Sequence, residues 1–505
     1  MIFLLSLIIP IIAFFFEIYP RLENRLFGVD IWTHLLYLQE YHKQNGIPKK
    51  IENGFLITGD YDYPPAFIYI LSKFSIALVK NYEFIFSPFF DSLHIILIYF
   101  IVYSLTQNIG IALLTQLFYM LTPIIVLENS SATPRSLGYS LFTIVFISLF
   151  LFSFSHIYIY LFLAIVCGAF IFLSHRFTTQ GYLFLAILFS IYEKNVLYVG
   201  AFCVSFILAI IISKGFYLKV LQGHIGNLLF WQKNIAYRFA HQVKGNYSEY
   251  KTQDFVFRIY NQFLKFPPFV LIITNPWLLS AGSNYFFSLP PEQIYNKLVL
   301  WALFSFLLAL MTTWVPQLRF LGEGQRYLEL SAFPVAFLSA IAFSYLLKTR
   351  YSFLASVLYI LIGLLAALTI IVIQRKAIVK DTLRSITPGL EKLFVYLQSL
   401  KIKPKLLCIP HQMTTSIIYH TGCPVFVNAD YAHIEKISDV YPYIKKPLPE
   451  IMEKYDLDLI LLNEAYAKIE DLQLKNYQVV KKIDTFLLIK LVSSHPRRVE
   501  DLSKC

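Results

Sequence analysis

The chain has 505 residues, of which 57% are hydrophobic, 17% aromatic and only 15% charged. Soluble domains carry about 25% charged residues, so this composition excludes an ordinary soluble globular protein and predicts a polytopic membrane protein. The net charge is +12, but the basic residues lie in loops between apolar segments. That distribution favours attraction to phosphate-bearing lipids or sugar-phosphates, or control of membrane topology, over binding of nucleic acid.

About eleven apolar segments reach or approach the roughly 20 residues needed to cross a bilayer. They are 2–18, 88–106, 109–127, 137–154, 156–174, 178–193, 195–213, 268–288, 297–315, 328–347 and 352–373. The first has no basic start and no small-residue cleavage site, so we expect a retained helix and not a signal peptide. The segment 64–78 is shorter and interrupted, and the proline in its first turn predicts a helix lying at the membrane interface.

Two parts of the chain are not apolar. Residues 19–87 form a long loop behind the first span, and its polar stretch 27–65 is too long to be an idle connection. After residue 380, short β-rich runs alternate with amphipathic stretches, which predicts a small α/β domain with a partly parallel sheet. We therefore predict a mainly α fold, with a transmembrane bundle over 1–375 that includes the loop 19–87, and a C-terminal α/β domain over 376–505.

The sidedness follows from the basic residues. Lys348 and Arg350 flank a very short loop between two spans, which the positive-inside rule places in the cytoplasm. Counting back puts the loop 19–87 and everything after residue 374 on the outer face. The many basic residues of the loop 214–267 then also lie outside. Either the number of spans is off by one, or these cations bind an anionic ligand on the outer face. We favour the anionic ligand.

The polar loop 19–87 holds two candidate acidic sites. Asp30 and His34 are spaced i, i+4, so both face the same way if a helix begins there. Asp30 could serve only as a helix cap, or its carboxylate could act as a general base on a hydroxyl or amine. Asp60 and Asp62 alternate in an extended segment, where they could hold a divalent ion or simply form the turn before a helix.

Basic residues occur at three of the expected outer helix ends. Arg135 precedes one span, His175-Arg176 lies between two spans, and Arg326 follows Glu323 and begins another. Any one arginine could be an interfacial anchor. Together, Arg135, Arg176 and Arg326 could converge on one anionic head group, because a guanidinium matches the geometry of a phosphate. The glycines on either side of Glu323 would let the backbone come close to that ligand.

With these residues in view, the chain resembles the GT-C superfamily of integral-membrane glycosyltransferases, in particular the protein O-mannosyltransferases and the aminoarabinose transferases of lipid A. The resemblance covers the layout of the whole chain. Its local motifs are Gly28-Val29-Asp30 with His34 downstream, Tyr63-Pro64-Pro65, Thr133-Pro134-Arg135, and Gln325-Arg326-Tyr327 leading into a span. The chain lacks the W-W-D type of motif that characterises oligosaccharyltransferases, which argues against that branch.

The resemblance implies a donor in which a sugar is linked to a polyprenyl phosphate, and an acceptor that is a glycan, a lipid or a protein. It implies that Asp30 is the catalytic base or a substrate-orienting carboxylate, and that Arg326 meets the donor phosphate. Our extension by geometry adds Arg135, His175 and Arg176. His34 and Glu323 are further candidates for binding the substrate or the donor phosphate. Many relatives have a second carboxylate next to the first, and this chain has none, which leaves open the sugar and the need for Mg²⁺ or Mn²⁺ at Asp60 and Asp62.

The expected reaction is a direct displacement with inversion at the anomeric carbon, at the outer face of a prokaryotic cytoplasmic membrane. Asp30 would take the proton of the acceptor while the arginines stabilise the departing polyprenyl phosphate. The alternative is a transporter or flippase of lipid-linked sugars. Transporters tend to carry ionisable residues at mid-membrane, whereas the spans expected here are nearly free of charge, so we favour the transferase.

Overall fold

The computed structural model describes residues 2–51, 54–238, 240–245, 267–283, 293–428 and 430–492. The chain divides into two compact units. The first unit contains Met1–Ile31, Asp62–Ile235 and Lys251–Asp381, and the second contains Trp32–Tyr61, Ala236–Tyr250 and Thr382–Cys505. The sequence assigned the whole loop 19–87 to the transmembrane part. In the structure, the middle of that loop belongs to the second unit together with the C-terminal region.

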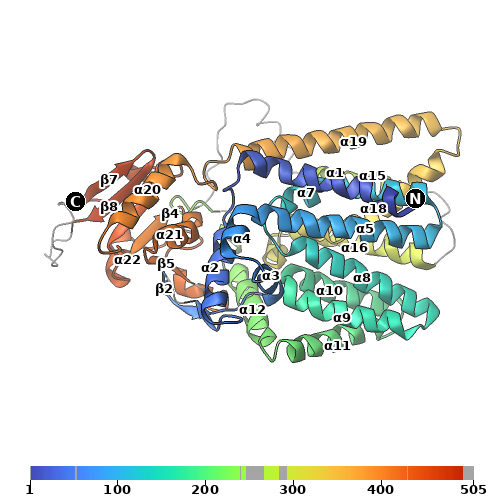
Figure 1. The fold of residues 1–505 in the computed structure, drawn as a ribbon, viewed down its shortest axis with the longest axis horizontal. Coiled ribbons are helices and arrows are strands. Elements are labelled where there is room, and N and C mark those ends of the chain that lie inside the picture. The colour runs from blue at the N-terminus through green and yellow to red at the C-terminus, as the bar shows by residue number, and fades with distance from the viewer. Residues whose placement is uncertain are drawn as a thin grey trace. The chain divides into compact units, whose positions relative to one another are not determined.

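The first unit is built from helices (Figure 1). In chain order they are α1 Ile2–Glu23, α3 Pro65–Leu71, α4 Ile76–Tyr82, α5 Phe86–Thr106, α6 Ile109–Met120, α7 Pro123–Asn129, α8 Arg135–Ser155, α9 Tyr158–Ser174, α10 Arg176–Tyr192, α11 Leu197–Ile212, α12 Tyr217–Lys233, α14 Pro267–Thr274, α15 Trp277–Ser283, α16 Gln293–Trp314, α17 Gln325–Glu329, α18 Ala332–Leu346 and α19 Ser352–Gln374. The helix α2, Asp30–Lys43, begins in the first unit and continues in the second.

Several expected spans are broken in the structure. Among the described residues, five helices are long and apolar enough to cross a membrane, or up to seven if each bent pair is one span. The expected span 109–127 consists of α6 and α7, which are bent by 60° where Pro123 starts the second helix. The expected span 195–213 corresponds to α11, which is followed by a 120° turn into α12. The apolar helices confirm an integral membrane protein, but the count of about eleven spans is not confirmed.

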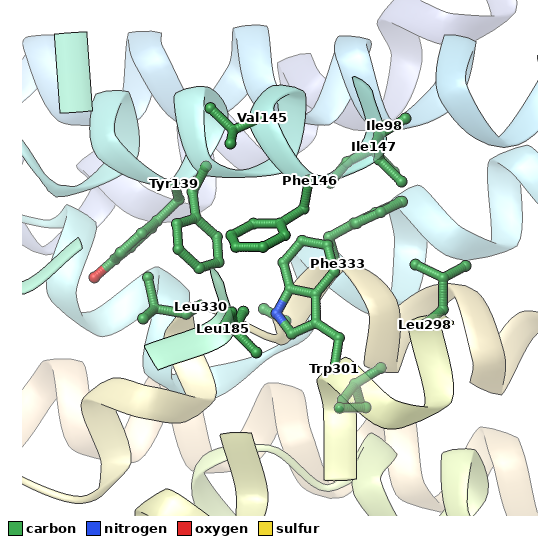
Figure 2. Packing of buried hydrophobic residues seen from close by; sticks show 14 of the residues in the cluster. Ile98, Tyr139, Val145, Phe146, Ile147, Leu185, Leu298, Trp301, Leu330 and Phe333 are labelled. Carbon is green, nitrogen blue, oxygen red and sulfur yellow. The ribbon is translucent and has the colours of Figure 1, made fainter. Parts of the chain in front are cut away.

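The core of the bundle combines aliphatic side chains with many aromatic rings (Figure 2). Phe146 of α8 lies with its ring centroid 5.4 Å from that of Trp301 of α16, and Trp301 contacts Phe333 of α18 at 6.2 Å. Offset and edge-on ring contacts of this kind stabilise a core beyond the area that they bury. This packing joins α8, α16 and α18, and two of these helices begin beside the candidate site.

Ionisable side chains lie inside the bundle, among them Glu17, Asp91 and His94, which differs from the nearly charge-free spans expected from the sequence. Glu17 of α1 accepts a hydrogen bond from Asn129 Nδ2 at 3.2 Å. Asp91 of α5 accepts one from the Tyr119 hydroxyl at 2.9 Å, and that hydroxyl also lies 3.0 Å from His94 Nδ1. All five side chains are buried. Hydrogen bonding of this kind is what allows polar groups to remain inside an apolar bundle.

The second unit contains the predicted α/β domain with a partly parallel sheet. Its six strands have the order β2-β5-β4-β6-β8-β7. The first four are parallel to one another. Strand β8 is antiparallel to β6, and β7 is antiparallel to β8. The strands are β2 Phe55–Ile57, β4 Leu406–Ile409, β5 Val425–Asn428, β6 Leu459–Asn463, β7 Tyr477–Ile483 and β8 Phe486–Leu491. The helices α20 Pro388–Ser399, α21 Thr414–Thr421 and α22 Leu448–Lys454 belong to the same unit (Figure 1).

The first loop contributes directly to this second unit. Strand β2 forms the edge of the sheet beside β5, and the short strands β1 Lys50–Ile51 and β3 Gly59–Asp60 pair with each other. Trp32 of α2 packs its ring 4.7 Å from that of His420. The loop is therefore a structural part of the α/β unit, which the sequence did not indicate.

Candidate functional site

Arg135, the first residue of α8, is the centre of a group of charged side chains in the first unit. Its guanidinium forms an ion pair with Glu128 of α7, and its Nη1 lies 3.7 Å from Glu329 Oε1 of α17. The Arg135 side chain is only 12% exposed. A guanidinium at the end of an apolar helix is thus held between two carboxylates and turned away from bulk solvent.

A buried ion pair holds the loop between α7 and α8, which leads into Arg135. Arg21 is 0% exposed and pairs with Glu83. Arg21 Nη1 donates to the carbonyl of Ser130 at 3.0 Å, while Glu83 Oε2 accepts from the amide of Ala132 at 3.1 Å. Both backbone groups lie in the loop between α7 and α8, so we call Arg21 and Glu83 the loop clamp. It fixes the point at which α8 begins.

His175 lies between α9 and α10 in an extended conformation, and the pKa of its imidazole responds to the charges around it. Its Nδ1 lies 2.8 Å from Thr178 Oγ1. Burial lowers the pKa of the His175 imidazole well below its ordinary value, and the positive charges of Arg135, Arg326 and Arg176 lower it further. His175 is therefore neutral at physiological pH. The structure brings these three arginines within electrostatic range of one histidine, and we call them the arginine cluster.

Arg176, which begins α10, forms an ion pair that the sequence did not anticipate. Its Nη2 lies 3.1 Å from Asp62 Oδ1, and Asp62 is 2% exposed. The backbone of α12 passes close to this pair, because a Cβ atom on Gly223 would lie 2.2 Å from Asp62 Oδ2 and 2.8 Å from Arg176 Nη2. Asp62, which the sequence analysis considered as a ligand of a divalent ion or as a turn residue, forms an ion pair with Arg176. Gly223 makes room for this pair.

Arg326 lies at the start of α17 and contacts Glu323, with its Nε 3.4 Å from Glu323 Oε2. Burial and the charge of Arg135 lower the pKa of Arg326, while the negative charges of Glu323 and Asp30 raise it. Gly324 packs closely against α16, because a Cβ atom there would lie 2.3 Å from the carbonyl oxygen of Ala309.

Asp30 is the first residue of α2 and is exposed. Its carboxylate acts electrostatically on Arg326, so it belongs with the arginine cluster. An exposed carboxylate can receive a proton from a molecule that arrives from solvent.

Two other side chains predicted for the site belong to the second unit. His34 lies one helical turn after Asp30 on α2 and is 3% exposed. Asp60 lies in β3, where it pairs in register with Lys50 of β1. The group of charges described above is built from first-unit residues alone.

Glu329 and Glu128 are site residues that the sequence analysis did not select. Glu329 is 2% exposed, and burial raises the pKa of its carboxyl to about 7, although Arg135 acts in the opposite direction. A sequence signal for it did exist, because Glu329 stands three residues after Arg326 as a single acid at the start of an apolar run. A lone acid in such a run is unfavourable unless it has a function or a partner.

Four acidic side chains of this region are paired with arginines. They are Glu128 and Glu329 with Arg135, Asp62 with Arg176, and Glu323 with Arg326. A divalent cation would need several oxygen ligands that point at one position. Within the part of the chain that the structure describes, no three His, Cys, Asp or Glu side chains gather as metal ligands do.

No protein-family model matches the chain, and no curated protein matches it either. Solved structures do. An oligosaccharyltransferase of Archaeoglobus fulgidus, tethered to an acceptor peptide with an NVT sequon, has a TM-score of 0.57 and 12% identity over 91% of this chain and 69% of its own. ArnT of Cupriavidus metallidurans, bound to undecaprenyl phosphate, has a TM-score of 0.56 and 9% identity over 98% of this chain and 99% of its own.

These likenesses extend over most of the chain at low identity, so they establish the fold. Both relatives are GT-C membrane glycosyltransferases, and the resemblance inferred from the sequence is confirmed at the level of fold. The oligosaccharyltransferase is similar to this chain in fold although the W-W-D type of motif is missing here. The missing motif therefore argues against the oligosaccharyltransferase branch but does not affect the likeness in fold.

Proposed function

We propose that this protein is a membrane glycosyltransferase that moves a sugar from a polyprenyl-phosphate donor to an acceptor at the outer face of the membrane. The observation that carries the proposal is the arginine cluster, in which Arg135, Arg176 and Arg326 come from three helix ends and all act electrostatically on His175. A solved structure of the same fold, ArnT, holds undecaprenyl phosphate. Guanidinium groups match phosphate oxygens in both charge and geometry.

In the proposed reaction, a lone pair of the acceptor attacks the anomeric carbon from the side opposite the phosphate. The bond between that carbon and the phosphate oxygen breaks, and its electron pair stays on the phosphate. Asp30 accepts the proton that the acceptor loses. The arginine cluster stabilises the charge that develops on the leaving phosphate, at about 3–4 kcal/mol for a well-placed donor. Inversion at the anomeric carbon follows from the single displacement.

The proposed donor is a lipid, which accounts for the need for an apolar bundle beside the charges. The polyprenyl chain would lie along the helices while its phosphate meets the arginine cluster. The acceptor would approach Asp30, which is exposed. We place these helix ends, together with the second unit, on the outer side of a prokaryotic cytoplasmic membrane, because the short basic loop with Lys348 and Arg350 marks the cytoplasmic side.

A transporter or flippase of lipid-linked sugars is the second candidate, and one observation favours it. Glu17, Asp91 and His94 are buried inside the bundle, and ionisable residues inside a membrane often line a transport path. The two functions separate in proteoliposomes that are supplied with a labelled lipid-linked sugar. A transferase moves the label onto an acceptor, whereas a flippase moves the intact lipid across the bilayer.

The test of the transferase is Asp30→Asn, which keeps the shape of the side chain and removes the base. We expect the rate of sugar transfer to fall by about 10²–10⁴, with expression and membrane insertion unchanged. The control is Asp456→Asn, which changes a 74% exposed carboxylate of the second unit and should leave transfer at the wild-type rate. Near-normal transfer by the Asp30 variant would remove Asp30 from the mechanism.

A further inference from the structure

Glu329 is not accounted for by the mechanism above, and its surroundings are unusual for a carboxylate. It is the last residue of α17 and is 2% exposed. Among the described residues, neither of its side-chain oxygens has a hydrogen-bond partner. Its nearest cation is Arg135, whose Nη1 lies 3.7 Å from Oε1, farther than a hydrogen bond. An ionised carboxylate in such a place lacks most of the stabilisation that it needs.

Among the described residues, the one cation in an ion pair with Glu329 is Arg135, and this guanidinium has another partner. Arg135 forms a direct ion pair with Glu128, and the proposed donor phosphate would be a third anion on the same guanidinium. A negative charge on Glu329 would repel that phosphate across a poorly hydrated site, where charges interact more strongly than in water. A neutral Glu329 would release Arg135 to the phosphate without this cost.

The other charges around Glu329 do not remove the repulsion between an ionised Glu329 and the proposed phosphate. Helix α17 packs against α7, α14 and α16. Of these, α7 contributes Glu128, α14 has no titratable side chain, and the only charge of α16, Lys297, is paired with Glu193. Tyr119 of α6 also interacts electrostatically with Glu329.

On α17 itself, Arg326 is paired with Glu323 and is also within electrostatic range of Arg135 and Asp30. His175 is neutral, for the reason given above. The nearby cation available to Glu329 is thus Arg135, the one that the phosphate would also need.

We propose that Glu329 is a positioning residue that takes up a proton when the donor phosphate binds to Arg135. The inference rests on the proposed function, because it concerns the same phosphate. In the donor complex the Glu329 carboxyl is neutral, and Arg135 is turned to the phosphate. In the free protein the carboxylate holds Arg135 in place.

The direction of the pH dependence follows from linkage. Burial already raises the pKa of Glu329 to about 7 in the free protein, and a bound anion raises it further. Donor binding is therefore at full strength below this pKa. It weakens by about tenfold for each pH unit as the pH rises above it, until the pKa of the complex is reached.

The experiment measures the affinity of the purified full-length protein for a polyprenyl methyl phosphodiester. This probe keeps a single charge across the range, so only the protein titrates. Between about pH 5.5 and 8.5, the wild-type dissociation constant should rise by about tenfold per unit above pH 7. Glu329→Gln, which is permanently neutral, should bind at all pH values as tightly as the wild type does at low pH. Glu128→Gln, which alters the other partner of Arg135, should keep the wild-type pH profile.

A second measurement uses the wild type alone and does not depend on how the variants fold. Calorimetric titrations in two buffers of different ionisation enthalpy count the protons taken up on binding. We expect about half a proton at pH 7 and close to none at pH 5. A wild-type pH profile in Glu329→Gln, or no proton uptake at pH 7, overturns the inference. Failure of every protein to bind the probe at any pH would instead refute the proposed donor site.

Discussion

The loop clamp gives the sharpest test of how the site is supported. Arg21→Met removes the guanidinium and keeps an unbranched side chain of similar length. Three backbone carbonyls lose a donor: those of Ser130 at 3.0 Å, Asn24 at 3.2 Å and Arg25 at 2.7 Å. Glu83, which is 2% exposed, loses its ion-pair partner. Removal of one partner from a buried pair costs about 3–5 kcal/mol, because the other charge stays buried without compensation.

The Arg21→Met substitution should lower both the stability of the protein and its affinity for the donor. We expect a lower melting temperature in detergent, and a higher KM for the lipid donor, because the loop that begins α8 would no longer fix Arg135. The control is Arg25→Met. The Arg25 side chain is exposed, so this variant should stay within about 0.5 kcal/mol of the wild type.

The double variant Arg21→Met/Glu83→Leu separates the two effects. Replacement of a whole buried ion pair by apolar residues is often neutral for stability, so its melting temperature should return toward that of the wild type. The donor KM should stay high, since the Ser130 carbonyl and the Ala132 amide still lack their partners. If the double variant recovers donor binding together with stability, the loop clamp does not position Arg135 and our reasoning is wrong.

Two further predictions concern the Arg176–Asp62 pair and metal dependence. Gly223→Ala places a Cβ atom 2.2 Å from Asp62 Oδ2, so we expect a loss of about 1–3 kcal/mol in stability from overpacking, with slower sugar transfer. Gly200→Ala is the matched control, because its Cβ atom would have no neighbour within 4 Å, and its thermal melt should not fall. Sugar transfer should persist in EDTA, because arginines neutralise the phosphate; loss of activity that Mg²⁺ or Mn²⁺ restores would contradict this.

The positions of the three arginines could be predicted from the sequence, but their partners could not. Arg135, Arg176 and Arg326 each stand next to an apolar run, and a cation at such a place belongs at a helix end. The partner of Arg176 is Asp62, which lies 114 residues earlier in the chain. No periodicity or spacing links residues that far apart, because tertiary packing alone brings them together.

The span count is not confirmed for a different reason. A hydropathy window measures the average composition of a segment and does not detect a bend within it. Residues 109–127 are apolar throughout, yet Pro123 starts a new helix at 60° to the previous one. Likewise β2 is only three residues long, and its place beside β5 depends on a strand that lies more than three hundred residues later in the chain. Sequence patterns describe the elements, whereas bends and long-range pairs are set by tertiary structure.

The pairing of each arginine of the cluster with a carboxylate explains how the proposed phosphate site can exist at the end of an apolar bundle. An uncompensated guanidinium in such surroundings is costly, so each one needs an anion before the substrate arrives. The incoming phosphate must then compete with the resident acid. Asp62, at 2% exposure, lies 3.1 Å from Arg176 and forms a direct ion pair with it. Glu329 is too far from Arg135 for a hydrogen bond. In our proposal it is therefore the carboxylate that the phosphate displaces from Arg135, because it loses no hydrogen bond when it takes up a proton.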